Sequence, residues 1–97
     1  MFIDKFYTIE SKEENRAVVR LSDENHPLFK AHFPDAPIMP GFVNFEIVSD
    51  VFDIDIVAIK KAKFLDKALP NQTLIYERDG NKFKVICNDK EIASFSL

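Results

Sequence analysis

Three prolines at three-residue intervals constrain this chain more than any other feature of its sequence. They are Pro34, Pro37 and Pro40. Each proline fixes its own φ and disfavours helical backbone at the residue before it, so the segment is predicted to be a stiff loop. Gly41 follows, and residues 42–52 are rich in apolar side chains without a further proline or glycine. A buried helix is therefore predicted to begin at or just after Pro40 and Gly41.

Three carboxylates recur along this predicted helix. Glu46, Asp50 and Asp53 lie about one turn apart and would share one face. If Glu46 is buried, its pKa rises, which suits a group that donates a proton near neutral pH. The alternative is a solvated polar strip that also includes Asn44. The helix pattern alone favours the strip, because charged residues on helices are mostly solvated.

Composition predicts one small domain over residues 1–97. The chain is 46% hydrophobic and includes ten phenylalanines. This is enough for a single core, but small domains bury a low fraction of their surface, so oligomerisation is expected. The net charge of −3 and the lack of a long basic run argue against a nucleic-acid partner. We expect no membrane span, no signal peptide and a cytoplasmic location.

The sequence offers little for a metal or a cofactor. Cys87 is the only cysteine, which excludes a disulfide within the chain, and it is expected to pack in a strand as a small hydrophobe. His26 and His32 lack a third ligand at zinc-site spacing. Gly41 and Gly80 are the only glycines, so there is no glycine-rich phosphate loop. No metal site and no cofactor are predicted.

The rest of the chain reads as strands. Residues 2–10, 16–21, 56–65, 73–78, 82–87 and 91–97 are predicted strands, with a hairpin turn at Asp79, Gly80 and Asn81. Leu28 and Phe29 are expected to plug the loop that carries His32. One helix and about six strands predict an α+β fold with an antiparallel sheet.

The proline segment resembles the HFPxxPIMPG motif of the β-hydroxyacyl-acyl carrier protein dehydratases. The matching residues are His32, Phe33, Pro34, Pro37, Ile38, Met39, Pro40 and Gly41. Glu46 also falls at the family's interval after the histidine, and residues 26–33 resemble the lead-in of the shorter, free-standing members. Ala31 and Asp35 depart from the motif, since glycine is usual or common at both positions.

This resemblance implies a hot-dog fold, in which the sheet wraps around one central helix. It implies dehydration of 3-hydroxyacyl thioesters on acyl carrier protein to trans-2-enoyl thioesters, in fatty-acid or polyene-type biosynthesis. By the same resemblance His32 is the base, Glu46 is the acid, and the Gly41 N–H meets the carbonyl oxygen. Family members are homodimers that build each site from the histidine of one subunit and the glutamate of the other.

The apolar residues around this motif have two interpretations. Phe33, Met39, Phe42 and Phe45 line a tunnel for the acyl chain, or they are simply core. The basic residues likewise either dock an acidic carrier protein or protect a solvated sheet edge. They are Lys60, Lys61, Lys63, Lys67, Arg78, Lys82 and Lys84, of which Lys61, Lys63 and Lys67 are expected to share one face of a strand.

Two other functions remain open. A hot-dog thioesterase would hydrolyse the thioester with a carboxylate-activated water, although the HFPxxPIMPG motif speaks against it. A non-catalytic acyl-binding or scaffolding protein is the other alternative, because Ala31 and Asp35 depart from the motif and the family often has a glutamine in place of Asp50.

Overall fold

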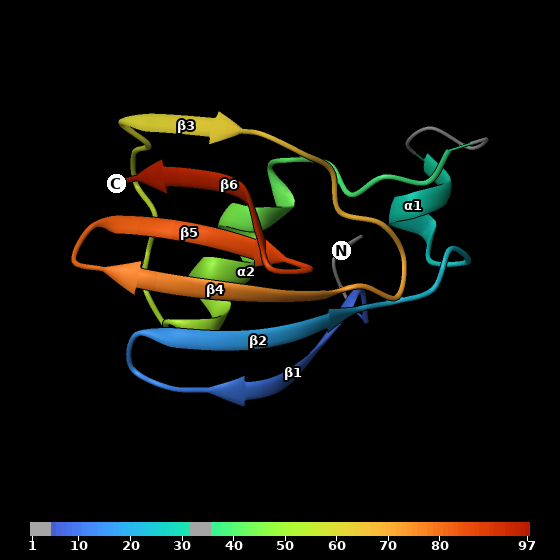
Figure 1. Ribbon diagram of the computed structural model, residues 1–97, viewed down its shortest axis with the longest axis horizontal. Coiled ribbons are helices and arrows are strands. Elements are labelled where there is room, and N and C mark those ends of the chain that lie inside the picture. Colours follow the sequence, from blue (N-terminus) through green and yellow to red (C-terminus); the bar gives the residue numbers. More distant parts are fainter. Residues whose placement is uncertain (1–4, 32–35) are drawn as a thin grey trace.

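The structure is a computed structural model that describes residues 5–31 and 36–97. Within these residues the elements are β1 (Tyr7–Lys12), β2 (Arg16–Leu21), α1 (Pro27–Ala31), α2 (Val43–Val51), β3 (Lys61–Phe64), β4 (Thr73–Asp79), β5 (Lys82–Cys87) and β6 (Lys90–Ser96). The strands form one antiparallel sheet in the order β1-β2-β4-β5-β6-β3 (Figure 1). This confirms the predicted α+β class and the six-stranded antiparallel sheet.

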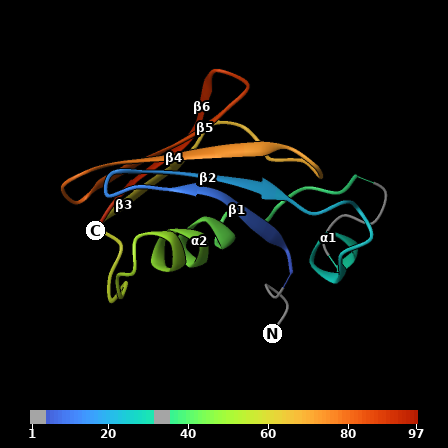
Figure 2. The ribbon, with the colours of Figure 1, turned by 90° about the horizontal axis from the view of Figure 1, so that it is seen from below.

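The sheet curves over α2, and both helices lie on the same side of it (Figure 2). Alternate residues of β2, β4 and β5 are buried, as expected when one face of a strand covers a core. Val43, Ile47, Val48 and Val51 of α2 meet that face and are almost fully buried. Burying a side chain of this size stabilises the fold by roughly 1.5–3 kcal/mol. Cys87 is buried in β5, as predicted.

The short helix α1 was not predicted. Pro27 occupies its first position, where the missing N–H and the fixed φ of proline suit a helix start. The Leu28 N–H donates to Nδ1 of His26 at 3.0 Å, which satisfies one of the amides at the helix start. Leu28 and Phe29 are buried. The loop around His32, against which they were expected to pack, lies outside the described residues.

The predicted length of two strands was wrong. The first strand was expected over residues 2–10, of which 2–4 lie outside the described residues, and β1 begins at Tyr7 and continues to Lys12. The strand expected over residues 56–65 is confined to Lys61–Phe64. This strand is at the edge of the sheet, and its one neighbour, β6, pairs with it only from Ala93 to Ser96. Residues 56–59 therefore have no partner strand within the described residues, and the Lys60 N–H donates to the Ser96 carbonyl at 3.0 Å.

The predicted hairpin between β4 and β5 is confirmed. Its loop consists of Gly80 and Asn81, and Gly80 has a φ of +61°, which favours glycine.

In the part of the chain that the structure describes, no helix has the length and apolar character needed to cross a membrane.

Candidate active site

The residues predicted for the site fall into two groups. His32 and Phe33 lie outside the described residues. Gly41, Phe42, Phe45 and Glu46 lie at the start and on the first turns of α2, and Met39 precedes it.

The start of α2 is a tight turn built on the proline segment. The amides of Val43, Asn44 and Phe45 donate to the carbonyls of Pro40, Gly41 and Phe42, each at 3.1 Å. These bonds span three residues, which is the pattern that often tightens a helix end. The Met39 N–H donates to the Ala68 carbonyl at 2.9 Å and ties the proline segment to the chain after β3. The predicted helix start is thus confirmed.

A hollow of about 470 Å³ opens beside Gly41, within the usual size range of small-molecule sites. Met39 and Phe42, two of the predicted tunnel residues, line it together with Gly41. Phe45 instead packs its ring edge-on against Phe95, with the ring centroids 4.9 Å apart. The core interpretation therefore describes Phe45 better.

Phe64 of β3 also lines this hollow, directly against Gly41. A methyl group on Gly41 would lie 3.0 Å from Cε1 and 3.1 Å from Cζ of Phe64. Glycine at this position permits the close approach of the Phe64 ring, and its φ is not among the positive φ values of the described chain. Sequence reasoning missed Phe64; its one signal was an aromatic side chain at the end of a lysine-rich strand.

Glu46, Asp50 and Asp53 are exposed, as the solvated-strip interpretation of the helix required. Asn44 was wrongly placed on that strip, because it is only 3% exposed. Asn44, Val48 and Val51 recur at intervals of four and three residues and share the face that meets the sheet. The Asn44 side chain accepts a hydrogen bond of 2.6 Å from the Tyr76 hydroxyl and donates one of 3.2 Å to the Gly41 carbonyl.

Asp50 is held from β1, because the Tyr7 hydroxyl donates a hydrogen bond to its carboxylate. Burial raises the pKa of Tyr7 well above its usual value, and the bond to Asp50 adds to the rise. Of the neighbouring carboxylates Glu46 and Asp50, Asp50 thus has a hydrogen-bond partner on β1.

Within residues 5–31 and 36–97, no group of three histidine, cysteine or acidic side chains is arranged to hold a metal ion.

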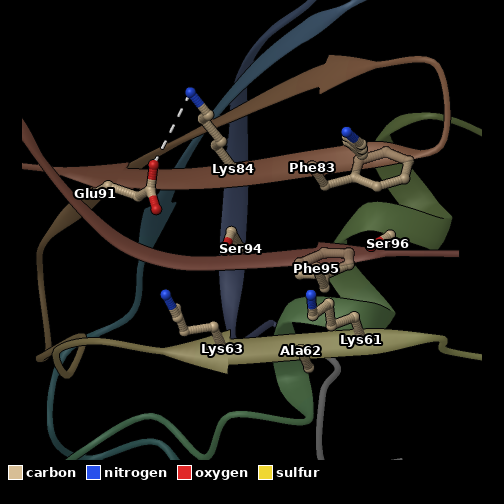
Figure 3. Close-up of a pocket in the computed structure, with 10 residues that line it drawn as sticks. Lys61, Ala62, Lys63, Phe83, Lys84, Glu91, Ser94, Phe95 and Ser96 are labelled. Atoms are coloured by element: carbon tan, nitrogen blue, oxygen red, sulfur yellow. Dashed lines mark ion pairs between the residues drawn. The ribbon is translucent and has the colours of Figure 1, made fainter.

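A second hollow, of about 400 Å³, is lined by lysines from two strands with serines between them (Figure 3). The strand registers place Ser96 between Lys61 and Lys82, and Ser94 between Lys63 and Lys84. We call Lys61, Lys63, Lys82 and Lys84 the lysine surface. Lys84 lies 4.0 Å from the carboxylate of Glu91.

Of the other basic residues, Lys67 lies apart from this surface and Arg78 lies next to it. Lys67 follows the end of β3 and lines the hollow beside Gly41, so only Lys61 and Lys63 share the predicted strand face. Arg78 lines a neighbouring hollow together with Lys82 and Lys84, and its guanidinium lies 5.9 Å and 5.8 Å from the ring centroids of Phe52 and Phe83.

Solved structures define the fold class. The chain resembles a chain of the dehydratase heterocomplex ApeI:P from Xenorhabdus doucetiae, with a TM-score of 0.65 and 20% identity over 91% of this chain and 89% of that chain. It also resembles the PaaI protein of the phenylacetic acid degradation operon of E. coli, with a TM-score of 0.59 and 17% identity over 97% and 82% of the two chains. The fold is the hot-dog fold that the motif implied.

Sequence comparison gives the family. Residues 9–96 match the ApeI-like family, described as ApeI dehydratase, and the chain belongs to this family. It is 39% identical over 56 residues to the 3-hydroxyacyl-acyl-carrier-protein dehydratase FabZ of Caldanaerobacter subterraneus, covering 57% of this chain. It is 30% identical over 90 residues, or 79% of this chain, to FabZ of Clostridium tetani. The matches span 40% and 63% of the lengths of these relatives.

Proposed function

We propose that residues 1–97 form one dehydratase domain that acts in the cytoplasm on 3-hydroxyacyl chains attached to an acyl carrier protein. The product is the trans-2-enoyl thioester, in fatty-acid or polyene-type biosynthesis. The observation that carries this proposal is the hollow that opens at the Gly41 turn, in a chain of the ApeI-like family. The relatives named as dehydratases of carrier-bound 3-hydroxyacyl groups support the substrate class.

The chemistry divides among three groups. His32 removes the weakly acidic proton next to the thioester carbonyl, and Glu46 gives a proton to the hydroxyl on the neighbouring carbon. The C–H and C–O bonds break, the double bond forms between the two carbons, and water leaves. Negative charge grows on the carbonyl oxygen during proton removal. The Gly41 N–H at the start of α2 stabilises that charge, because backbone amides and the positive end of the helix dipole favour an anion.

The acyl chain occupies the hollow, with Met39 and Phe42 as walls. Phe33 is retained as a lining residue from its place in the motif. Phe45 supports the wall from behind, since its ring lies 6.2 Å from that of Phe64, centroid to centroid. Apolar walls around a few polar groups are the usual composition of such sites.

A second copy of the chain completes this site in our proposal. Glu46 is exposed in the single chain, although an acid that holds its proton near neutral pH generally needs burial. β3 is an edge strand, and large apolar side chains are exposed on it and next to it: Val57, Ile59, Phe64 and Leu65, with Val57 95% exposed. An unpaired edge beside an exposed apolar surface is a typical site of chain association.

Sedimentation tests this homodimer. Val57→Asp places a charge on the proposed interface and is expected to give monomers without activity. Ile9→Asp is the matched control, because Ile9 is also exposed but lies on β1 at the opposite edge of the sheet. A monomeric wild type, or a dimer that survives Val57→Asp, would contradict the homodimer. The similar Xenorhabdus protein is a heterocomplex, so a monomeric wild type would turn the search to a different partner chain.

The lysine surface is proposed to dock the carrier protein, which is acidic. Four ammonium groups and the Glu91 carboxylate line one hollow, so its local charge is positive on a chain whose net charge is −3, and such a surface can attract an anionic partner at long range. Lys61→Glu with Lys63→Glu is expected to raise KM for a carrier-bound substrate and leave KM for the same acyl group on free pantetheine unchanged. Lys12→Glu on β1 is the control. An equal effect on both substrates would contradict docking.

Turnover of carrier-bound 3-hydroxyacyl chains of several lengths, followed by mass spectrometry, tests the reaction itself. Wild type should remove water, and His32→Ala and Glu46→Gln should abolish the loss. Release of free acid would instead indicate a thioesterase. Binding of the acyl carrier without any change of mass would indicate a non-catalytic acyl-binding protein.

A further inference from the structure

A buried polar path connects the sheet to the start of α2. In the part of the chain that the structure describes, Asn44 is the one polar residue within the core, and it meets the fully buried Tyr76 of β4. The Tyr76 hydroxyl donates to Oδ1 of Asn44 at 2.6 Å. Nδ2 of Asn44 donates to the Gly41 carbonyl at 3.2 Å, and the Asn44 N–H donates to the same oxygen at 3.1 Å.

Core stability alone does not require this pair. Buried polar groups cost free energy unless they are hydrogen-bonded, and replacing both partners by apolar groups of similar shape is often neutral or stabilising. A leucine and a phenylalanine would fill the same space. This replacement would remove only the hydrogen bonds that connect Tyr76 on the sheet, through Asn44, to the Gly41 carbonyl.

These hydrogen bonds act on the peptide group that follows Gly41. Glycine has no side chain to restrict its backbone, so Gly41 is a weak point at the beginning of α2. The bonds from Asn44 hold the carbonyl on one side of Gly41. The bond from the Val43 N–H to the Pro40 carbonyl, 3.1 Å long, holds the peptide on the other side. Together they fix the direction of the Gly41 N–H.

We propose that Asn44 and Tyr76 are positioning residues that aim the Gly41 N–H at the thioester oxygen. This inference rests on the proposed function, which gives that N–H its role. Asn44 also lines the hollow, so the path ends where the substrate is proposed to lie. Neither side chain touches the reacting atoms in this account.

The glycine content of the chain permits a direct test without catalysis. Gly41 and Gly80 are its only glycines, so protein labelled with ¹⁵N-glycine gives two amide signals. Gly80 lies in the β4–β5 loop and is the internal control. Tyr76→Phe and Asn44→Leu should shift the Gly41 signal, because the peptide groups on either side of Gly41 then take a different orientation. The Gly80 signal should not change. A Gly41 signal unaffected by either variant would overturn the proposal.

Kinetics supply the second test. Tyr76→Phe is expected to lower kcat about tenfold and change KM less than about twofold, since a misaimed donor weakens stabilisation of the transition state more than binding. Val19→Ala is the matched control, because Val19 is fully buried on β2 and lines no part of the hollow. Its variant loses packing but no polar contact, so its kcat should stay at the wild-type value.

The double variant Asn44→Leu, Tyr76→Phe separates positioning from stability. It leaves neither polar group of the pair unpaired, so its melting temperature should recover relative to Tyr76→Phe, while kcat stays low. Recovery of kcat together with the melting temperature would overturn the proposal. A folded wild type without dehydration would refute the proposed function, and the Gly41 signal would still decide whether the path holds that amide.

Discussion

Replacing Gly41 by alanine is expected to separate activity from stability. The substitution adds one methyl group at the start of α2, on the wall of the hollow proposed for the thioester. The methyl carbon would lie 3.0, 3.1 and 3.4 Å from three atoms of the Phe64 ring. Real contacts of this kind are rarely so short, and the ring therefore has to move by a few tenths of an ångström.

The cost to stability should be small. Phe64 is 50% exposed on the edge strand, so its ring can turn toward solvent. Gly41 is outside the left-handed region, and alanine in place of a glycine whose backbone it can adopt stabilises a fold by about 0.4–1 kcal/mol, because the unfolded chain then has fewer conformations to lose. The two effects oppose each other, so the free energy of unfolding should change by less than about 1 kcal/mol.

The cost to activity should be large. The methyl group and the displaced ring occupy the space where the carbonyl oxygen is proposed to meet the Gly41 N–H. A displacement on the order of 1 Å at a reacting group can lower a rate about a hundredfold, which corresponds to about 2.7 kcal/mol. We therefore expect kcat/KM to fall about a hundredfold, measured by loss of water from a carrier-bound 3-hydroxyacyl chain.

Gly80→Ala is the matched control, because it is expected to lower stability and leave activity unchanged. Gly80 has a φ of +61° and no atom within 4 Å of an added methyl group. Alanine should cost about 1–2 kcal/mol of stability there, since left-handed backbone is strained for residues with a Cβ, and leave turnover unchanged. Full activity of Gly41→Ala would refute the reasoning. The reasoning is also refuted if the loss of activity is explained by the fraction of unfolded Gly41→Ala protein, measured in a denaturant titration.

The remaining predictions concern three titratable side chains. Tyr7→Phe removes the hydrogen bond to Asp50 and should lower the free energy of unfolding in urea by about 1 kcal/mol, against little change for the exposed neighbour in Thr8→Ala. Burial raises the pKa of Tyr76, so the folded chain keeps a proton that the unfolded chain releases above about pH 10. Its contribution to stability is complete below that pH and falls by up to about 1.4 kcal/mol per unit above it, and Tyr76→Phe should show a shallower decline. Burial, with Asp66 adding, raises the pKa of the Cys87 thiol, so a thiol reagent should modify native protein at least about a hundredfold more slowly than unfolded protein; equal rates would contradict its burial.

Local patterns predicted most of the fold. The start of α2 followed from Pro40 and Gly41, the bounds of β2 followed from β-favouring apolar residues between polar turns, and the bounds of β5 followed from the hairpin turn before it. Helical spacing alone places Asn44 on the buried face with Val48 and Val51. We grouped it instead with the nearby acidic residues, and that prediction was wrong. The length of β3 could not be predicted from the local sequence, because this edge strand extends only as far as it pairs with β6.

The site was predictable only where the motif is continuous in sequence. The Tyr76–Asn44 bond joins residues 32 positions apart, and the approach of Phe64 to Gly41 depends on how the edge strand packs over α2. Neither pair has a signal in a single sequence. The roles of His32 and Glu46 stay predictions that rest on the motif.

Mixing two inactive variants tests the shared dehydratase site most directly. In a mixed dimer of His32→Ala and Glu46→Gln, one site carries both substitutions and the other has an intact histidine and an intact glutamate. With free exchange of subunits, half of the dimers are mixed, so the equimolar mixture should recover about a quarter of wild-type turnover. No recovery, with subunit exchange demonstrated and wild type active, would contradict a site built from His32 of one copy and Glu46 of the other.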